Sequence, residues 1–380
     1  MTNYSQECLQ ILELLKDRKN VLMMGPPASG KTRLMSEVAD AFQNGFIAQS
    51  TPKSPQHIPD ATIPIPAQAP SGAGTTPIPQ LPSPDRTQRR VFKIVFNANS
   101  KPRDFLSGLV PEVRPDAAST TFRVAEGKLI QANKFALEPD SAALLIIDEL
   151  NRGPAVQLFG DALVALEADK RLDENNQPLP TTWTFDVLNQ HGVTEPMALS
   201  THVYVLAAMN QADVSVEPLD VAFIRRWEPF RVKPNSEIAR QLLGAAGEDA
   251  SLPEIPTTPG EVVEAAIRAW IRVNNHIETG RGEEFQLGHG VFLTRNTAPP
   301  PTLEQALDFA IAWWNAIVAH VDEVFFGDVF GMAATLRADP DSAFYRLESV
   351  AFGQDQRQVL RRPVIIDRSN IYSLLRWIAG

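Results

Sequence analysis

The stretch Val21-Leu22-Met23-Met24-Gly25-Pro26-Pro27-Ala28-Ser29-Gly30-Lys31-Thr32-Arg33 decides the fold of this chain. It matches the pattern G-x-x-x-x-G-K-[ST], with an apolar run before it and a helical pattern from about Lys31 to Phe42 after it. Backbone N–H groups of such a loop and the positive end of the following helix can surround phosphate oxygens. The sequence therefore predicts a phosphate-binding loop between a buried strand and a helix, rather than an ordinary Gly/Pro turn.

Side chains at the end of this loop suit a nucleotide. Lys31 is expected to neutralise the β- and γ-phosphates, and the Thr32 hydroxyl to ligate Mg²⁺. We assign the whole run from Gly25 to Arg33 to nucleotide binding.

A second apolar run, Leu144-Leu145-Ile146-Ile147, ends in two carboxylates, Asp148 and Glu149. Beside a phosphate-binding loop, Asp148 is expected to hold the Mg²⁺ shell, and Glu149 to orient or deprotonate the attacking water. A solvated acidic strand end is the simpler alternative.

Two further polar elements follow along the chain. Asn210 ends the apolar run Val203 to Ala207, where its amide could contact the γ-phosphate or the water. Arg225 and Arg226 precede Trp227, and one of them is expected to act as an arginine finger on a neighbouring subunit's nucleotide. The sequence does not decide between the two arginines.

The order of strands and helices indicates an α/β fold with a mainly parallel sheet. Strands are expected at 21–24, 91–96, 144–147, 203–207 and 229–232, separated mostly by helical patterns. Beyond about Pro234 the strands stop and apolar residues recur at helical spacing. We therefore expect an α/β nucleotide-binding domain over 1–233 and a smaller helical domain over 234–380.

An insertion interrupts the first domain. Residues 51–85 contain ten prolines, little charge and many small polar residues. Because such a composition cannot maintain a strand ladder or bury enough apolar surface, the sequence predicts a disordered surface segment at about 51–85, with a Pro-rich docking ligand as the alternative.

Composition limits the function. The 380 residues carry a formal net charge of −10, which disfavours a broad nucleic-acid footprint, and the single cysteine, Cys8, lies on an apolar helical stripe where packing is its expected role. No long apolar run or signal-peptide pattern is present, so a cytoplasmic protein is expected. The histidines show no zinc-ligand spacing.

Together the motifs resemble the AAA+ proteins, and several segments resemble their McrB-like branch. These segments are Leu145 to Gly153, Leu158 to Leu163, Met209 to Ser215, Asp104 to Leu109 and Leu287 to Phe292. The resemblance implies an AAA+ core followed by a helical lid. It also implies that Asn151 helps to place the attacking water, and it adds Asp213 and His289 to the nucleotide-binding candidates. His289 could equally be a histidine that packs at a domain junction.

Two departures limit the resemblance. Val214 and Gln211 replace the usual Arg and Thr in a segment associated with guanine preference, so we expect ATP as fuel and leave GTP open. The chain also begins almost directly with the motor, so target recognition is expected from another subunit.

The resulting expectation is a Mg²⁺-dependent NTPase that forms a homo-oligomeric ring, expected to be a hexamer. By resemblance its partner is a McrC-like nuclease subunit, DNA is reached through partners or the pore, and the setting is defence against foreign DNA. The alternatives are a MoxR-like chaperone that remodels a protein client and a nucleotide-binding scaffold without turnover.

Overall fold

The computed structural model describes residues 4–48, 75–112, 121–212, 219–293 and 298–380. It divides into two compact units, each made of several chain segments. The first comprises Met1–Met23, Thr32–Ala208 and Val216–Phe230; the second comprises Met24–Lys31, Met209–Ser215 and Arg231–Gly380. The phosphate-binding loop thus clusters with the C-terminal part of the chain.

A five-stranded sheet in the order β11-β1-β10-β7-β4 forms the centre of the α/β part, as the sequence predicts. Its strands are β1 (Asn20–Gly25), β4 (Gln88–Val95), β7 (Ser141–Asp148), β10 (Val203–Asn210) and β11 (Glu228–Arg231). Both β10 and β4 pair with β7 in parallel, with Val203 opposite Ala143 and Gln88 opposite Ser141. β1, β7 and β10 are buried along almost their whole length, which is typical of strands covered on both faces.

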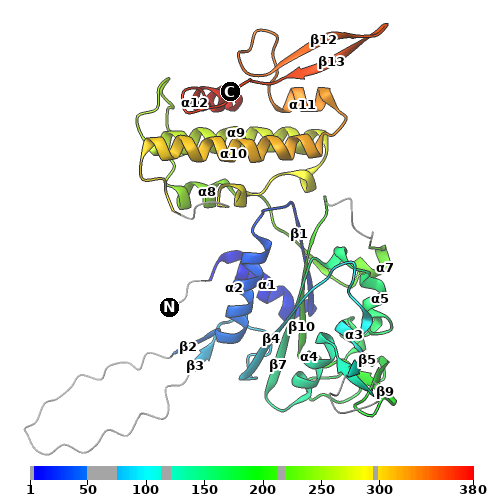
Figure 1. Cartoon of the computed structure of the whole chain (residues 1–380). Coiled ribbons are helices and arrows are strands. Elements are labelled where there is room, and N and C mark those ends of the chain that lie inside the picture. The colour runs from blue at the N-terminus through cyan, green and yellow to red at the C-terminus, as the bar shows by residue number, and fades with distance from the viewer. Residues whose placement is uncertain (1–3, 49–74, 113–120, 213–218, 294–297) are drawn as a thin grey trace, which may run out of the picture. The chain divides into compact units, whose positions relative to one another are not determined.

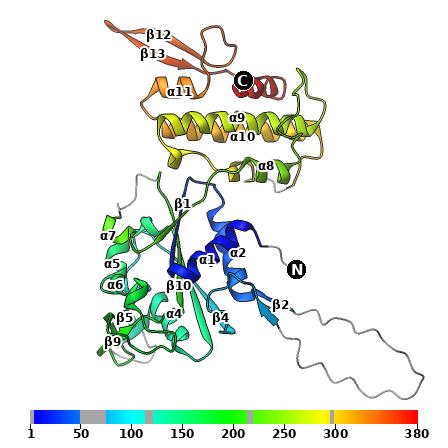
Figure 2. The ribbon, with the colours of Figure 1, turned by 180° about the vertical axis from the view of Figure 1, so that it is seen from behind.

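Helices cover this sheet on two sides. In Figures 1 and 2, α1 and α2 lie on one side of the strands, and α5 and α7 lie on the other. The helices of this part are α1 (Gln6–Arg18), α2 (Lys31–Asn44), α3 (Pro102–Phe105), α4 (Lys128–Leu137), α5 (Ala155–Phe159), α6 (Ala162–Ala165) and α7 (Val221–Ile224), with 3-10 turns η1 (Leu150–Arg152) and η2 (Ala168–Lys170). Cys8 is buried in α1, where burial is the largest cause that raises the pKa of its thiol to about 12.

Three hairpins extend from this framework. They are β2 (Phe46–Ala48) with β3 (Thr75–Pro77), β5 (Ser107–Glu112) with β6 (Thr121–Glu126), and β8 (Thr184–Leu188) with β9 (Thr194–Ala198). Residues 49–74 of the Pro-rich insertion lie outside the described residues. The prediction of disorder as far as 85 is wrong for its last part, because β3 is followed by Ile78 and Leu81, which are buried and anchor the returning chain.

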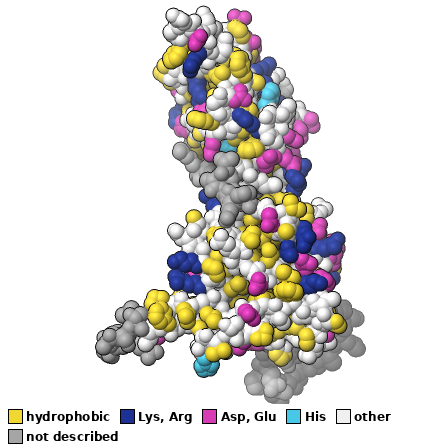
Figure 3. All heavy atoms as spheres, turned by 90° about the vertical axis from the view of Figure 1, so that its right-hand side faces the viewer, with side chains coloured by type: hydrophobic (Ala, Val, Ile, Leu, Met, Phe, Trp, Pro, Cys, Tyr) yellow, Lys and Arg dark blue, Asp and Glu magenta, His cyan; other side chains and the backbone are white. Residues whose placement is uncertain are grey.

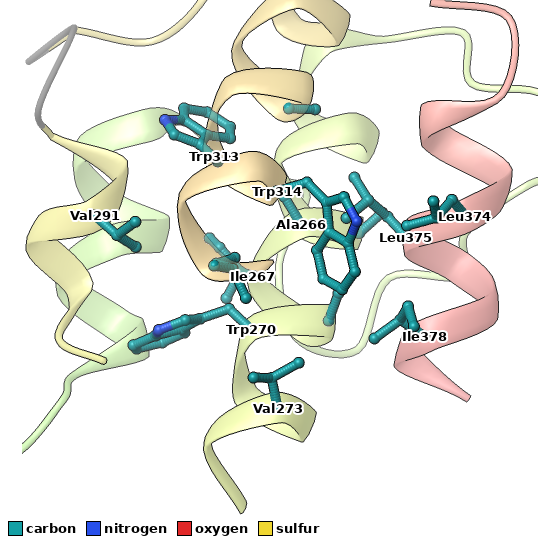
Figure 4. Close-up of a cluster of buried hydrophobic side chains, with 14 of the residues drawn as sticks. Ala266, Ile267, Trp270, Val273, Val291, Trp313, Trp314, Leu374, Leu375 and Ile378 are labelled. Atoms are coloured by element: carbon teal, nitrogen blue, oxygen red, sulfur yellow. The ribbon is translucent and has the colours of Figure 1, made fainter. Parts of the chain in front are cut away.

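The C-terminal unit is mainly helical. Its elements are α8 (Ser236–Leu243), α9 (Pro259–Gly280), α10 (Leu303–Val324), α11 (Val329–Thr335) and α12 (Ile371–Ala379), with η3 (Glu283–Phe285) and η4 (His289–Phe292). Figure 4 shows its core, in which side chains of α9, α10 and α12 meet around Trp270 and Trp314. No helix of the described residues is long and apolar enough to cross a membrane.

The expectation that strands stop at about Pro234 is wrong. β12 (Arg346–Phe352) and β13 (Asp355–Arg361) form an antiparallel hairpin near the end of the chain. Between them lies Gly353, at φ +64°, a conformation that favours glycine in tight turns. None of the strand residues of this hairpin is buried, so it gives none of the buried apolar runs from which the other strands were predicted.

A buried series of hydrogen bonds holds Ser83, near the end of the Pro-rich insertion, against the first unit. Ser83 Oγ lies 2.7 Å from both the hydroxyl of Tyr204 and Nδ1 of His202, and His202 Nε2 donates to the carbonyl of Glu174 at 2.9 Å. Because Nε2 carries the proton that Glu174 accepts, a neutral His202 ring accepts at Nδ1 from Ser83 Oγ. Burial is the largest cause that lowers the pKa of His202 below its usual 6.5.

Stability should therefore fall with acidification. Burial also lowers the pKa values of His276 and His320 below 6.5, so the unfolded chain binds more protons as the pH drops through about 6.5. We expect the free energy of unfolding to fall by on the order of 1 kcal/mol between pH 7.5 and 6, measured by urea unfolding. His202→Gln should reduce this pH dependence, and an identical pH dependence in the wild-type and His202→Gln proteins would contradict the assignment.

Candidate functional site

The phosphate-binding loop runs from the end of β1 at Gly25 to the start of α2 at Lys31. Ala28 and Gly30 have φ values of +59° and +92°, so the loop bends through left-handed backbone conformations. Lys31 Nζ donates to the carbonyl oxygens of Gly25 at 2.9 Å and Pro26 at 2.8 Å. The ammonium group is thus held over the loop, where phosphate oxygens could replace carbonyl oxygens as its partners.

Two glycines of the C-terminal unit contact this loop through the backbone. Gly288 N donates to Pro27 O at 2.9 Å, and Gly290 N donates to Ala28 O at 2.8 Å. A Cβ at position 288 would lie 2.1 Å from the carbonyl carbon of Ala28, too close for any side chain. The Gly-His-Gly segment is therefore a backbone support of the loop, which explains why glycine is needed on both sides of His289.

His289 is buried and faces the same loop. A Cβ built on Gly30 would lie 3.4 Å from His289 Nε2, and His289 Nδ1 accepts from the backbone N–H of Asn235 at 3.3 Å. The side chain packs against the phosphate-binding loop within the C-terminal unit. A nucleotide contact by His289 stays a prediction.

The acidic motif lies at the carboxyl end of β7. Asp148 Oδ1 accepts from the backbone N–H of Glu149 at 3.0 Å, and Glu149 adopts a left-handed conformation with φ +54°. Glu149 Oε2 pairs with Arg152 Nε at 3.0 Å. Asn151 is only 5% exposed. The two candidates Glu149 and Asn151 therefore lie in one tight turn, one partly exposed and the other buried.

Asn210 ends β10, which is the neighbour of both β1 and β7. Its side chain is half-buried, and the next residue, Gln211, lines a small pocket with Gly25 and Pro26. Asp213 and Val214 lie outside the described residues.

The two arginines differ sharply. Arg226 is almost buried: its Nε lies 3.1 Å from Glu167 Oε1, its side chain is 9% exposed, and its Nη1 donates to the carbonyl of Ala222. Among the described residues, the exposed side chain of Arg225 enters no ion pair or side-chain hydrogen bond. The structure therefore separates an exposed arginine from one held inside its own chain.

Two side chains of the first unit fit a Mg²⁺ ion. Thr32 is exposed in the first turn of α2, and Asp148 is half-buried with its carboxylate oriented by the Glu149 N–H group. Hydroxyl and carboxylate oxygens are hard donors of the kind that Mg²⁺ prefers, with phosphates and water completing the shell.

Surface charges agree with the acidic composition. On the face drawn in Figure 3, lysines and arginines occur in small groups close to acidic and hydrophobic side chains. This face offers no continuous basic stripe for nucleic acid.

The comparisons with known proteins agree with these motifs. Residues 71–227 match the AAA domain family of the dynein-related subfamily, a range that begins after the phosphate-binding loop. The McrB subunit of the type IV methyl-directed restriction enzyme of Escherichia coli (strain K12) is 24% identical over 332 residues, which cover 84% of this chain. The chain thus contains a region that matches the AAA domain family, and it resembles the McrB subunit over most of its length.

A second relative belongs to another restriction system. Component YdiS of the type II restriction enzyme BsuMI of Bacillus subtilis (strain 168) is 38% identical over 88 residues, or 22% of this chain. This chain spans 57% of the McrB subunit and 25% of YdiS. The solved structure of NtrX from Brucella abortus aligns with 89% of this chain and 64% of its own, at 12% identity and a TM-score of 0.33, a likeness too slight to support any inference.

Sequence reasoning missed the contacts that support these groups. It named Gly288 and Gly290 only as part of a family signature, and it gave Glu167 and Arg171 no role. The glycines on either side of His289 were the one sequence signal of a close backbone contact at 288–290. Nothing in the sequence marks Glu167 as the partner of Arg226.

The backbone support of the loop can be tested with Gly288→Ala. A Cβ at 288 must displace the Ala28 backbone, an overpacking cost of roughly 1–3 kcal/mol, so we expect nucleotide binding at least about tenfold weaker by isothermal titration. Gly280→Ala is the matched control, because its Cβ would meet only two ring carbons of Phe325, at 3.2 and 3.3 Å. Unchanged affinity in Gly288→Ala would contradict this role for the segment.

Proposed function

We propose that this chain is a Mg²⁺-dependent nucleoside triphosphatase whose active sites form between adjacent subunits of a ring. The observation that carries the proposal is the order of the central strands. The phosphate-binding loop, Asn210 and Asp148-Glu149 follow β1, β10 and β7, which are neighbours in one sheet. Polar groups at the ends of adjacent buried strands are suited to act on one ligand.

Binding of the triphosphate rests on the loop. Its backbone N–H groups and the start of α2 attract phosphate oxygens, and Lys31 exchanges its contacts with Gly25 and Pro26 for the β- and γ-phosphates. The Gly288 and Gly290 backbone keeps the loop in its bent conformation. Because the loop is bent before a nucleotide arrives, little ordering entropy is lost on binding.

Hydrolysis rests on the acidic turn. Thr32 and Asp148 would hold Mg²⁺, which neutralises charge on the phosphates when bound. Glu149 takes the proton of the attacking water or orients it, and Asn151 and Asn210 restrict the water's position. To act as a base, Glu149 must loosen its pair with Arg152.

Arg225 is the better candidate for the arginine finger, and it cannot serve its own loop. The carbonyl of Arg226 accepts from Asn20 Nδ2 at 3.2 Å, which places the arginines beside the first residue of β1. The loop begins at the other end of this strand, about 17 Å away at ~3.3 Å per residue. Because this exceeds the reach of an arginine side chain, Arg225 would act on the nucleotide of a neighbour.

Relatives suggest the biological setting. Both are named as parts of restriction enzymes, so we propose a motor subunit of a DNA restriction and antiphage system in the cytoplasm. The proposed assembly is a hexamer that drives a McrC-like nuclease, with DNA reached through this partner or the pore. ATP is the proposed fuel, and GTP is the other outcome of the test below.

The first test is phosphate release with Mg²⁺ and either ATP or GTP over a range of protein concentrations. Turnover should rise faster than linearly with concentration, because each site needs two subunits. Glu149→Gln should bind nucleotide but turn over about 10²- to 10⁴-fold more slowly. Glu348→Gln is the control, since this glutamate pairs with Arg361 Nε at 2.9 Å, much as Glu149 pairs with Arg152. Full activity in Glu149→Gln would refute the assignment.

The second test separates the two arginines by conservative replacement. A lysine at 225 loses the planar guanidinium that matches a phosphoryl group, so Arg225→Lys should lose about 10³-fold in kcat if the finger has its usual weight. A lysine at 226 can still pair with Glu167, so Arg226→Lys should keep most of the activity. The reverse ranking would show that Arg226 is the finger.

A further inference from the structure

A mostly buried cluster of polar groups includes Arg226, the residue that follows the exposed Arg225. It joins Asn20 at the start of β1, Leu166 and Glu167 after α6, Arg171, and Arg226. All of these residues belong to the first compact unit. We call this set the finger clamp.

Arg171 is the centre of the finger clamp. Its side chain is fully buried, and its guanidinium donates to Asn20 Oδ1 at 2.6 Å, to Leu166 O at 3.0 Å and to the carbonyl of Val203. Burial lowers the pKa of this guanidinium to about 9, so it stays charged at neutral pH. A buried charge that lost one of these acceptors would be strongly penalised, so the positions of Asn20 and Leu166 are fixed.

Asn20 passes this constraint on to the arginine pair. With its oxygen bound to Arg171, its amide nitrogen donates to Leu166 O at 2.8 Å and to the carbonyl of Arg226 at 3.2 Å. The Glu167 carboxylate, one residue after Leu166, pairs with the Arg226 side chain at 3.1 Å. Arg226 is therefore held at both its backbone and its side chain.

Aromatic packing holds the residues on either side. Phe223 and Trp227 are buried, and their rings lie 5.4 Å and 6.1 Å from that of Phe159 in α5. α5 closely follows the turn that contains Glu149 and Asn151. The segment that carries Arg225 thus packs against α5, the helix that follows the acidic motif of the same chain.

We propose that the finger clamp holds Arg225 in the position from which it reaches the neighbouring subunit's nucleotide, and that it links this position to the acidic motif of its own chain. The proposal rests on the trans role of Arg225 proposed above. Glu167 and Arg226 are positioning residues here and do not touch the nucleotide. Of the members, Glu167 is the one to change, because its side chain is 32% exposed and its loss leaves the buried Arg171 cluster intact.

The first readout is the kinetics of Glu167→Gln. We expect kcat to fall about tenfold and KM for nucleotide to stay nearly unchanged, because Glu167 acts through Arg226 and does not touch the nucleotide. The amide oxygen of a glutamine at 167 can still accept a hydrogen bond from the Arg226 guanidinium, so the chain should remain folded. Glu167→Asp should recover part of the rate by restoring the charge. Glu126→Gln is the matched control: Glu126 pairs with Lys134 at 2.6 Å and is 29% exposed, but lies outside the finger clamp.

The second readout uses rings that contain two variants, one that lacks a working Glu149 and one with an altered arginine segment. Two differently tagged chains are co-expressed and purified through both tags, so that every ring is mixed. Glu149→Gln chains have no working site of their own but donate an intact finger. In a mixed ring, a Glu167→Gln chain that keeps its own Glu149 can receive an intact arginine from a Glu149→Gln neighbour. Phosphate release per chain that keeps Glu149 should therefore rise toward the wild-type value. The same rise is expected when Glu149→Gln chains are mixed with Arg225→Ala chains.

The outcomes separate the two levels of the proposal. Rescue of Arg225→Ala but not of Glu167→Gln would overturn the finger clamp and leave the shared active site standing. Failure to rescue Arg225→Ala would overturn the trans finger itself. Wild-type kcat in Glu167→Gln alone would also overturn the positioning role.

Discussion

The fully buried guanidinium of Arg171 is the constraint on which the placement of Arg225, the proposed arginine finger, depends. A charge in this position is tolerated only if backbone and amide oxygens surround it, and these oxygens come from Asn20, Leu166 and Val203. Asn20 and Val203 begin β1 and β10, and Leu166 directly follows α6. The need to satisfy one charge therefore ties the amino ends of two central strands to the segment that carries Arg225.

The opposite ends of the same strands carry the groups for chemistry. Because β1, β7 and β10 are buried along their length, polar side chains can appear only where the strands end. The loop after β1, Asn210 and Asp148-Glu149 all lie at such ends. Ala28 and Glu149 adopt left-handed conformations, unfavourable for residues other than glycine, although five other such residues lie elsewhere. In the function proposed above, one end of the strands serves the chain's own nucleotide, and the other end presents an arginine to a neighbouring subunit.

Much of this arrangement could be predicted from the sequence, and the reason is local. The phosphate-binding loop, the acidic motif and the five central strands each consist of a continuous apolar or glycine-containing pattern. The contacts that the sequence did not show join residues far apart in the chain: Gly288 meets Pro27, Asn20 meets Arg226, and Glu167 meets Arg226. The choice between Arg225 and Arg226 depends on the last two contacts. The hairpin of β12 and β13 was missed because none of its strand residues is buried. The order of residues 75–85 was missed because its anchors, among them Ile78, Leu81 and Ser83, are scattered among prolines and meet partners far away in the chain.

The most direct test of this account is a cryo-electron microscopy structure of the assembled Glu149→Gln protein with Mg²⁺ and ATP, or with GTP if that proves to be the fuel. The account predicts that Arg225 of one subunit contacts the γ-phosphate bound by its neighbour's loop, while Arg226 remains paired with Glu167 of its own chain. A structure in which Arg226 leaves Glu167 to reach the phosphate, or in which the nucleotide is enclosed by a single subunit, would contradict it.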